Sequence, residues 1–166
     1  MKIQSLYDFY LIELHNLYDA ERQIVKALPK MIDASTSAEL KGAFRTHLDQ
    51  TQLHVNRLEE VFEMHAETPK AEKCYGMEGI LKEGQDLLKA NIDPNVRDAA
   101  LISAAQRVEH YEIATYGCVC TWADLLGFDR AAQVLRSTLE EEVAADGLLN
   151  SIAKSKVNAE AAHRAG

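Results

Sequence analysis

Acidic, amide and imidazole side chains recur at helical spacing in four separate parts of the sequence. In chain order they are Glu21; Gln50 and His54; Glu109 and Glu112; and Glu141, Glu142 and Asp146. Each set lies mid-way along a segment whose other inward positions are apolar. At this spacing the members of a set share one face of a helix. Oxygen ligands with one or two imidazoles suit iron or manganese, whereas thiolate sets favour zinc. If the segments pack side by side, these residues would form a site for two iron or manganese ions.

Charge balance gives the physical reason to expect cations at this level. An unpaired buried carboxylate costs several kcal/mol or takes up a proton, and neighbouring carboxylates repel one another. Basic residues are scarce on these faces, since Arg22, Arg57 and Arg107 reach the acids only from the helix edges. Two divalent or trivalent cations would compensate the charge, held about 3.5 to 4 Å apart by bridging carboxylates.

The sequence assigns these ligands only in part. The expected bridges are Glu21 with Glu109 or Glu112, and the expected terminal ligands are Gln50 or His54, and Glu142 or Glu141 with Asp146. Glutamates at 140–142 cover most of a helix circumference, so the choice between Glu141 and Glu142 stays open.

Each of these residues also has a plainer interpretation. His54 is as readily a hydrogen-bonded core histidine as a ligand, and Glu112 could lie on a solvated face. Asp146 could pair with a lysine or arginine across a dimer contact. We expect His47 and His65 to be structural or exposed.

Hydrophobic periodicity is helical almost throughout the chain. The predicted helices cover about 5–32, 37–65, 77–90, 94–126 and 130–153. Thr36 and Glu39 have capping-box spacing, and Pro94 suits a first helical turn. Gly127 is the expected C-cap that separates the last two long helices. Residues 155–166 have no apolar face and are expected to fray.

Four long helices and one extended connection predict an all-α bundle. The connection carries the short helix at 77–90, so one crossover joins the second and third long helices, which is the ferritin-like arrangement. The whole chain, 1–166, fits a single domain. A shift of 91 residues places Glu21 on Glu112 and Leu58 on Leu149, a weak internal repeat.

The bulk composition excludes several classes of partner. A net charge of −8 argues against nucleic acid and against an anionic membrane surface. No apolar run reaches the roughly 20 residues of a membrane span, and the N-terminus lacks a signal peptide's features. Three cysteines without an export signal indicate free thiols and a cytoplasmic protein.

Five sequence blocks follow one another within residues 6–152: "LYDAERQIVKAL", "HLDQTQLHVNRLEEVF", "KCYGMEGILKEG", "VRDAALISAAQRVEHYEIATYG" and "LEEEVAADGLL". Together they resemble the YciE/YciF family of ferritin-like bacterial stress proteins. The resemblance implies a ferritin-like homodimer with a dinuclear metal site, a link to stress responses and no established reaction.

Two departures from related sites bear on this implication. The family commonly shows "HLEET" where this chain has "HLDQT", so Gln50 replaces a charged donor and metal affinity should drop, with His54 positioned to compensate. Ferritin-like sites also use Glu-x-x-His pairs. In this sequence the pair occurs only at Glu160 and His163, in the tail.

Two functions from different classes follow. The leading hypothesis is a stress-associated protein with a carboxylate-rich dinuclear iron or manganese centre and oxidase- or peroxidase-like chemistry on dioxygen or peroxide. The alternative is a non-catalytic dimeric scaffold or partner-binding module whose metal site is degraded. The sequence leaves open whether the chain is an enzyme.

Overall fold

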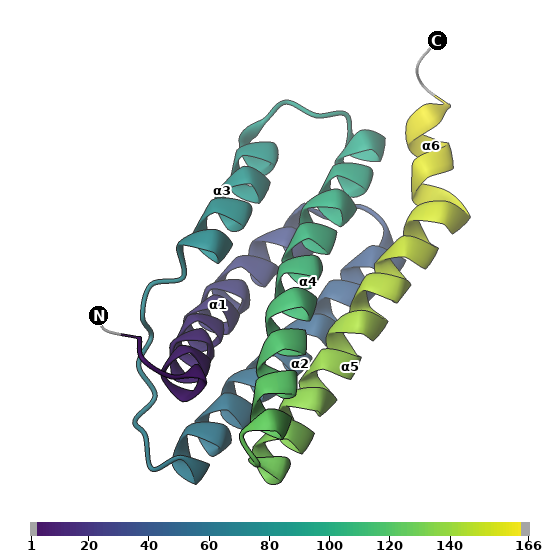
Figure 1. Cartoon of the computed structure of the whole chain (residues 1–166). Coiled ribbons are helices and arrows are strands. Elements are labelled where there is room, and N and C mark those ends of the chain that lie inside the picture. Colours follow the sequence, from purple (N-terminus) through teal and green to yellow (C-terminus); the bar gives the residue numbers. More distant parts are fainter. Residues whose placement is uncertain (1–2, 164–166) are drawn as a thin grey trace.

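Helices account for nearly all of the computed structural model, which describes residues 3–163 apart from the side chain of Asn95 (Figure 1). They are α1 (Leu6–Ala34), α2 (Ala38–Met64), α3 (Tyr75–Lys89), α4 (Pro94–Leu125) and α5 (Asp129–Ile152), followed by the π-helical turn η1 (Ala153–Val157) and α6 (Asn158–Ala162). None of the described residues forms a β-strand. In the same range, no helix is long and apolar enough to cross a bilayer.

Local capping sets where the first two long helices begin. The Ser5 hydroxyl accepts a hydrogen bond from the Asp8 amide at 3.1 Å, and the Asp8 carboxylate accepts from the Ser5 amide, which forms a capping box. The Ser37 hydroxyl caps α2 by accepting from the amide of Leu40. Thr36, expected to cap α2, instead donates its hydroxyl to Asp98 of α4 at 2.6 Å.

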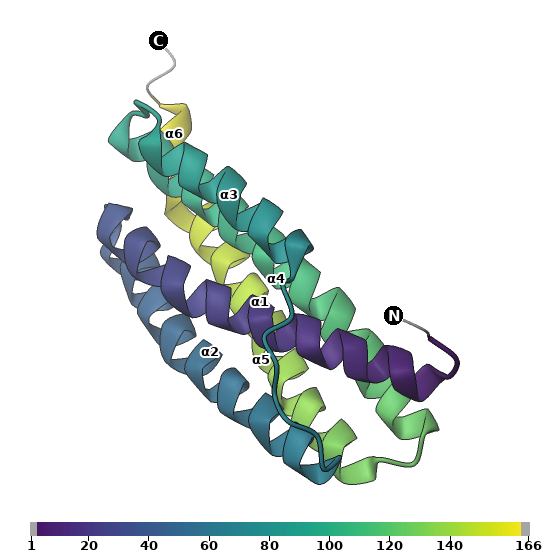
Figure 2. The same ribbon diagram turned by 90° about the vertical axis from the view of Figure 1, so that its left-hand side faces the viewer.

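The connections fix how the helices pair. Short turns join α1 to α2 and α4 to α5, so each pair forms an antiparallel hairpin. Residues 65–93 form the long crossover, which contains α3. Its first part, residues 65–74, runs back along the bundle and leads into α3 (Figure 2). Helix α3 packs against α1 and α4. The predicted all-α, ferritin-like bundle with one crossover is thereby confirmed.

The apolar core consists of two clusters at different levels of the bundle. One includes Ile24, Leu28, Phe44, Met77, Leu101 and Leu149, and the other includes Leu14, Leu17, Leu58, Phe62, Val119 and Leu135. The charged inner positions of α2, α4 and α5 fall between these two clusters along each helix. The clusters therefore leave a polar layer at mid-height and shield it on both sides from water.

The C-terminal end stays helical beyond the expected limit of order. Helices η1 and α6 continue to Ala162, and Val157 packs into the core with 2% exposure. Fraying was expected over residues 155–166. The last three of these, 164–166, lie outside the described residues. Glu160 and His163 are exposed and lie at this end of the chain.

Candidate metal centre

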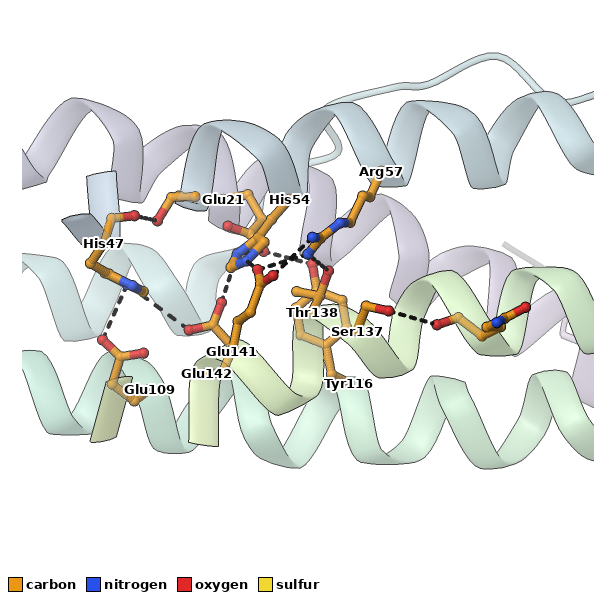
Figure 3. Close-up of polar contacts among 12 residues, drawn as sticks. Glu21, His47, His54, Arg57, Glu109, Tyr116, Ser137, Thr138, Glu141 and Glu142 are labelled. Atoms are coloured by element: carbon orange, nitrogen blue, oxygen red, sulfur yellow. Dashed lines mark hydrogen bonds and ion pairs between the residues drawn. The ribbon is translucent and has the colours of Figure 1, made fainter. Parts of the chain in front are cut away.

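Six charged or imidazole side chains from all four long helices meet in the polar layer. They are Glu21 of α1, His47 and His54 of α2, Glu109 and Glu112 of α4, and Glu142 of α5. None is more than 6% exposed. Figure 3 shows several of them turned toward one another across the bundle. Helical repeats place them on the inner stripes, where apolar side chains occupy the neighbouring levels.

Three of these residues form a first group around His54. Its Nδ1 lies 2.8 Å from Oε1 of Glu142 and 3.4 Å from Oε1 of Glu21. One ligand atom from each residue falls within 4.8 Å of the others. Buried Tyr116 donates its hydroxyl to Oε1 of Glu21 at 2.6 Å and so fixes that carboxylate.

A second group forms around His47. Its members are His47, Glu109, Glu112 and Glu142, whose ligand atoms also lie within 4.8 Å of one another. His47 Nε2 is 3.2 Å from Oε1 of Glu109 and 4.0 Å from Oε2 of Glu142. Because the other oxygen of Glu142 faces His54, this one carboxylate lies between the two groups.

Many polar atoms in this layer are buried without a hydrogen-bond partner. They are Oε2 of Glu21, Nδ1 of His47, Oε2 of Glu109, Oε2 of Glu142 and both carboxylate oxygens of Glu112, whereas Nδ1 of His54 and Nε2 of His47 have the ion-pair contacts given above. Buried polar atoms in folded proteins are nearly always satisfied, so such a cluster needs a physical explanation. The carboxylate oxygens and one ring nitrogen of each histidine can donate electron pairs to a metal ion, so the residues present fit bound metal.

The electrostatics of the metal-free layer favour protonated carboxyls. Burial, reinforced by the surrounding carboxylates, holds the pKa values of Glu109 and Glu112 well above their usual range. Burial also raises the pKa of Glu21. For Glu142, contacts with His54, Glu109 and His47 outweigh burial and lower its pKa. Cations bound here would displace protons from the first three side chains.

A carboxylate outside the layer orients His54. Nε2 of His54 donates to Oε2 of Glu141 at 2.7 Å, since a charged carboxylate can only accept. Arg57 in turn donates to both Glu141 oxygens, at 2.7 and 2.9 Å. This contact with Arg57 lowers the pKa of Glu141. The arrangement turns Nδ1 of His54 toward Glu21 and Glu142, as outer hydrogen bonds do for metal-bound histidines.

The structure thus brings together most, but not all, of the residues singled out in the sequence. Glu142 faces the layer, and Glu141 contacts it only through His54. Gln50 is half-buried and borders a small cavity beside His47. Asp146 lies outside both groups, accepts a hydrogen bond from Gln106 at 3.0 Å and sits 3.4 Å from Nε2 of exposed His110.

His47 is the member of the layer that the sequence analysis did not single out. Of the two expectations for His47, structural or exposed, the structure excludes the second, because the side chain is buried against Glu109. Its spacing of seven residues from His54, two helical turns on one face, is the signal that would have found it. Tyr116 follows Glu112 by four residues, so helical spacing likewise places the two side chains on one face.

Comparison with known proteins agrees with the fold. The family described as "Domain of unknown function (DUF892)" matches residues 5–162. Protein YciF of Escherichia coli (strain K12) is 40% identical over 166 residues, which cover 99% of this chain and 100% of that protein.

Two solved structures match as well. The crystal structure of the E. coli stress protein YciF has a TM-score of 0.90 at 40% identity, over 94% of this chain and 99% of that one. YcfI from Rhodopseudomonas palustris has a TM-score of 0.88 at 41% identity, over 90% and 95% of the two chains. The resemblance seen in the sequence is confirmed: this chain belongs to the DUF892 family and is similar over its whole length to the E. coli stress protein YciF.

Proposed function

We propose that this chain is a stress-associated protein that binds two iron or manganese ions in its buried polar layer. The observation that carries the proposal is the set of unsatisfied ligand atoms from four helices, enclosed between two apolar clusters. An apolar core would fold at lower electrostatic cost, and bound cations would account for the presence of these side chains.

The contacts support a role for each residue. Glu142 would serve both ions, because its two oxygens face different histidines. Glu21 and His54 would hold one ion, while His47, Glu109 and Glu112 would hold the other. This differs from the sequence expectation, in which Glu21 paired with Glu109 or Glu112 as bridges. Tyr116 keeps Glu21 in place, and the apolar clusters exclude water.

The proposed chemistry is oxidation by dioxygen or peroxide. Bound iron or manganese would supply one electron from each ion to such an oxidant. The protein's part is to hold the ligands, to keep bulk water away and to release the protons of Glu109 and Glu112 as the ions bind, since the raised pKa values of these two side chains favour the protonated form without metal.

Anaerobic titration with Fe(II) tests the proposal. Chelator-treated protein should bind two equivalents per chain, and a new absorption should appear on admission of oxygen. Glu142→Gln should lose most of this binding, because the variant lacks the shared carboxylate. Glu140→Gln is the matched control, since Glu140 is exposed on the same helix. Absence of binding at micromolar Fe(II) would contradict the proposal.

A non-catalytic scaffold is the second candidate. It is favoured by the raised pKa values of Glu109 and Glu112, which let these side chains remain neutral without any cation. Elemental analysis of protein purified without chelator separates the two functions. A scaffold would contain no stoichiometric metal, and Glu21→Ala with Glu109→Ala would leave its metal content unchanged.

The proposal also includes a cytoplasmic homodimer that binds no nucleic acid. Exposed apolar side chains, including Leu53, Leu125 and Val143, provide surface for self-association. Sedimentation equilibrium should give twice the chain mass of 18.5 kDa. The net charge of −8 should prevent retention on duplex DNA at physiological salt.

A further inference from the structure

A small cavity between α2 and α5 connects the protein surface to one side of the polar layer. Its volume is about 30 Å³. It is lined by Thr46, Gln50, His47 and Glu109 and by the apolar residues Ala43, Phe44, Ala145, Leu148 and Leu149. Thr46 and Leu148 are exposed, Gln50 and Ala145 are half-buried, and His47 and Glu109 are buried. The burial of the lining residues therefore increases from solvent toward the second group.

The size of this cavity suits a small hydrated cation, and four polar side chains follow one another along a wall that is otherwise apolar. About 30 Å³ of accessible space accommodates one or two water molecules, which need polar partners. Thr46, Gln50, His47 and Glu109 supply such partners along the cavity. The side-chain amide of Gln50 makes no hydrogen bond within residues 3–163. Its side-chain carbonyl oxygen is therefore free to contact a passing ion.

A second cavity that borders His47 and Glu109 is unsuitable for cations. It measures about 10 Å³, and its remaining lining consists of apolar residues such as Leu28, Met31 and Val108. A charged ion in so small an apolar space would lose its hydration without compensation.

The side of the layer around His54 is closed. Glu21 and His54 have no exposed surface. Tyr116 covers Glu21, while Glu141 and Arg57 together cover the outer edge of His54. A cation could reach this side directly only by displacing these hydrogen bonds.

We infer that metal cations reach the buried layer through the α2–α5 cavity, past Gln50, and meet His47 and Glu109 first. The inference rests on the proposed function, because it concerns how that centre is loaded. Gln50 then acts in uptake as a neutral oxygen donor at the mouth of the cavity, and Ala145 is the small residue that keeps the passage open.

Blocking the passage tests this inference. Ala145→Leu fills the cavity from α5, and Ala144→Leu makes the same change at the exposed neighbouring position. Each chelator-treated protein is mixed with Co(II), and loss of the free cation is followed with a chromophoric indicator. Ala145→Leu should slow uptake at least about tenfold with unchanged final stoichiometry, because loading then requires local opening of the helices. Ala144→Leu should match the wild-type rate.

A change of charge at the mouth provides an independent readout. Gln50→Glu should speed Co(II) uptake by about tenfold at low ionic strength, since a carboxylate concentrates cations locally, and salt should reduce the gain. Equal rates for Ala145→Leu and wild type, with normal wild-type stoichiometry, would overturn the access route alone. Failure of the wild-type protein to take up Co(II) would overturn the proposed function and the route together.

Discussion

At the scale of single residues, the position of Glu141 shows how neighbouring glutamates divide two tasks. Glu142 enters the polar layer, while Glu141 stays half-buried and connects Arg57 to the outer nitrogen of His54. One residue of offset on a helix is a rotation of about 100°, which is enough to separate a ligand position from an orienting position.

Neutralising the orienting carboxylate should weaken metal binding without removing a ligand. In Glu141→Gln the Arg57 contact loses its charge and His54 loses its charged acceptor, so Mn(II) affinity should fall about 10- to 100-fold. Competition with a fluorescent chelator measures the affinity. Glu140→Gln serves as control, and equal affinity in both variants would show that Glu141 does not orient His54.

At the scale of the elements, helices α3 and α4 approach each other closely at Gly76. A Cβ atom on Gly76 would lie 2.8 Å from Cε2 of Tyr111, whose hydroxyl contacts Sγ of Cys74 at 3.0 Å. The absence of a side chain at Gly76 therefore lets the crossover pack closely on the bundle.

Alanine scanning of the two nearby glycines tests this packing. Gly76→Ala should lower the free energy of unfolding by about 1–3 kcal/mol, because Tyr111 must move. Gly79→Ala, at a position with open space in the same helix, should raise it by up to about 1 kcal/mol through helix propensity. Urea unfolding measures both, and a stabilised Gly76→Ala variant would contradict the packing argument.

Local and non-local signals explain which elements could be predicted from sequence. Helix starts near Ser37 and Pro94 depend on caps within a few residues and were predicted closely. The role of Thr36 depends on Asp98, which is 62 residues away, and periodicity does not reveal it. His47 and Glu142 were unresolved for the same reason: the rotation of α2 and α5 about their axes is set by packing against neighbouring helices.

At the scale of the whole molecule, the buried polar layer shifts the pKa values of its side chains when no metal is bound. Burial lowers the pKa of His54, but contacts with Glu142 and Glu21 outweigh burial and raise it to about 10. Burial raises the pKa values of Glu109 and Glu112 as well. At these three side chains, the folded state without metal therefore binds protons more tightly than the unfolded chain does.

Stability of the metal-free protein should consequently fall as pH rises from about 6.5 to about 10. Protonated His54 stabilises the fold fully below its ordinary pKa of 6.5, and this contribution is lost as pH rises through about 10. Glu109 and Glu112 act in the same direction, because their protonated forms are favoured by folding. Thermal unfolding in EDTA at several pH values measures the trend. Added Mn(II) should restore stability most at the alkaline end, and a flat profile in EDTA would contradict the account.

Anomalous diffraction from crystals soaked in Fe(II) or Mn(II) tests the central claim most directly. The account predicts two peaks per chain on either side of Glu142, one beside Glu21 and His54 and the other beside His47, Glu109 and Glu112. A fully soaked crystal with no peak in the polar layer, and with the same side chains hydrogen-bonded to one another or to water, would contradict it.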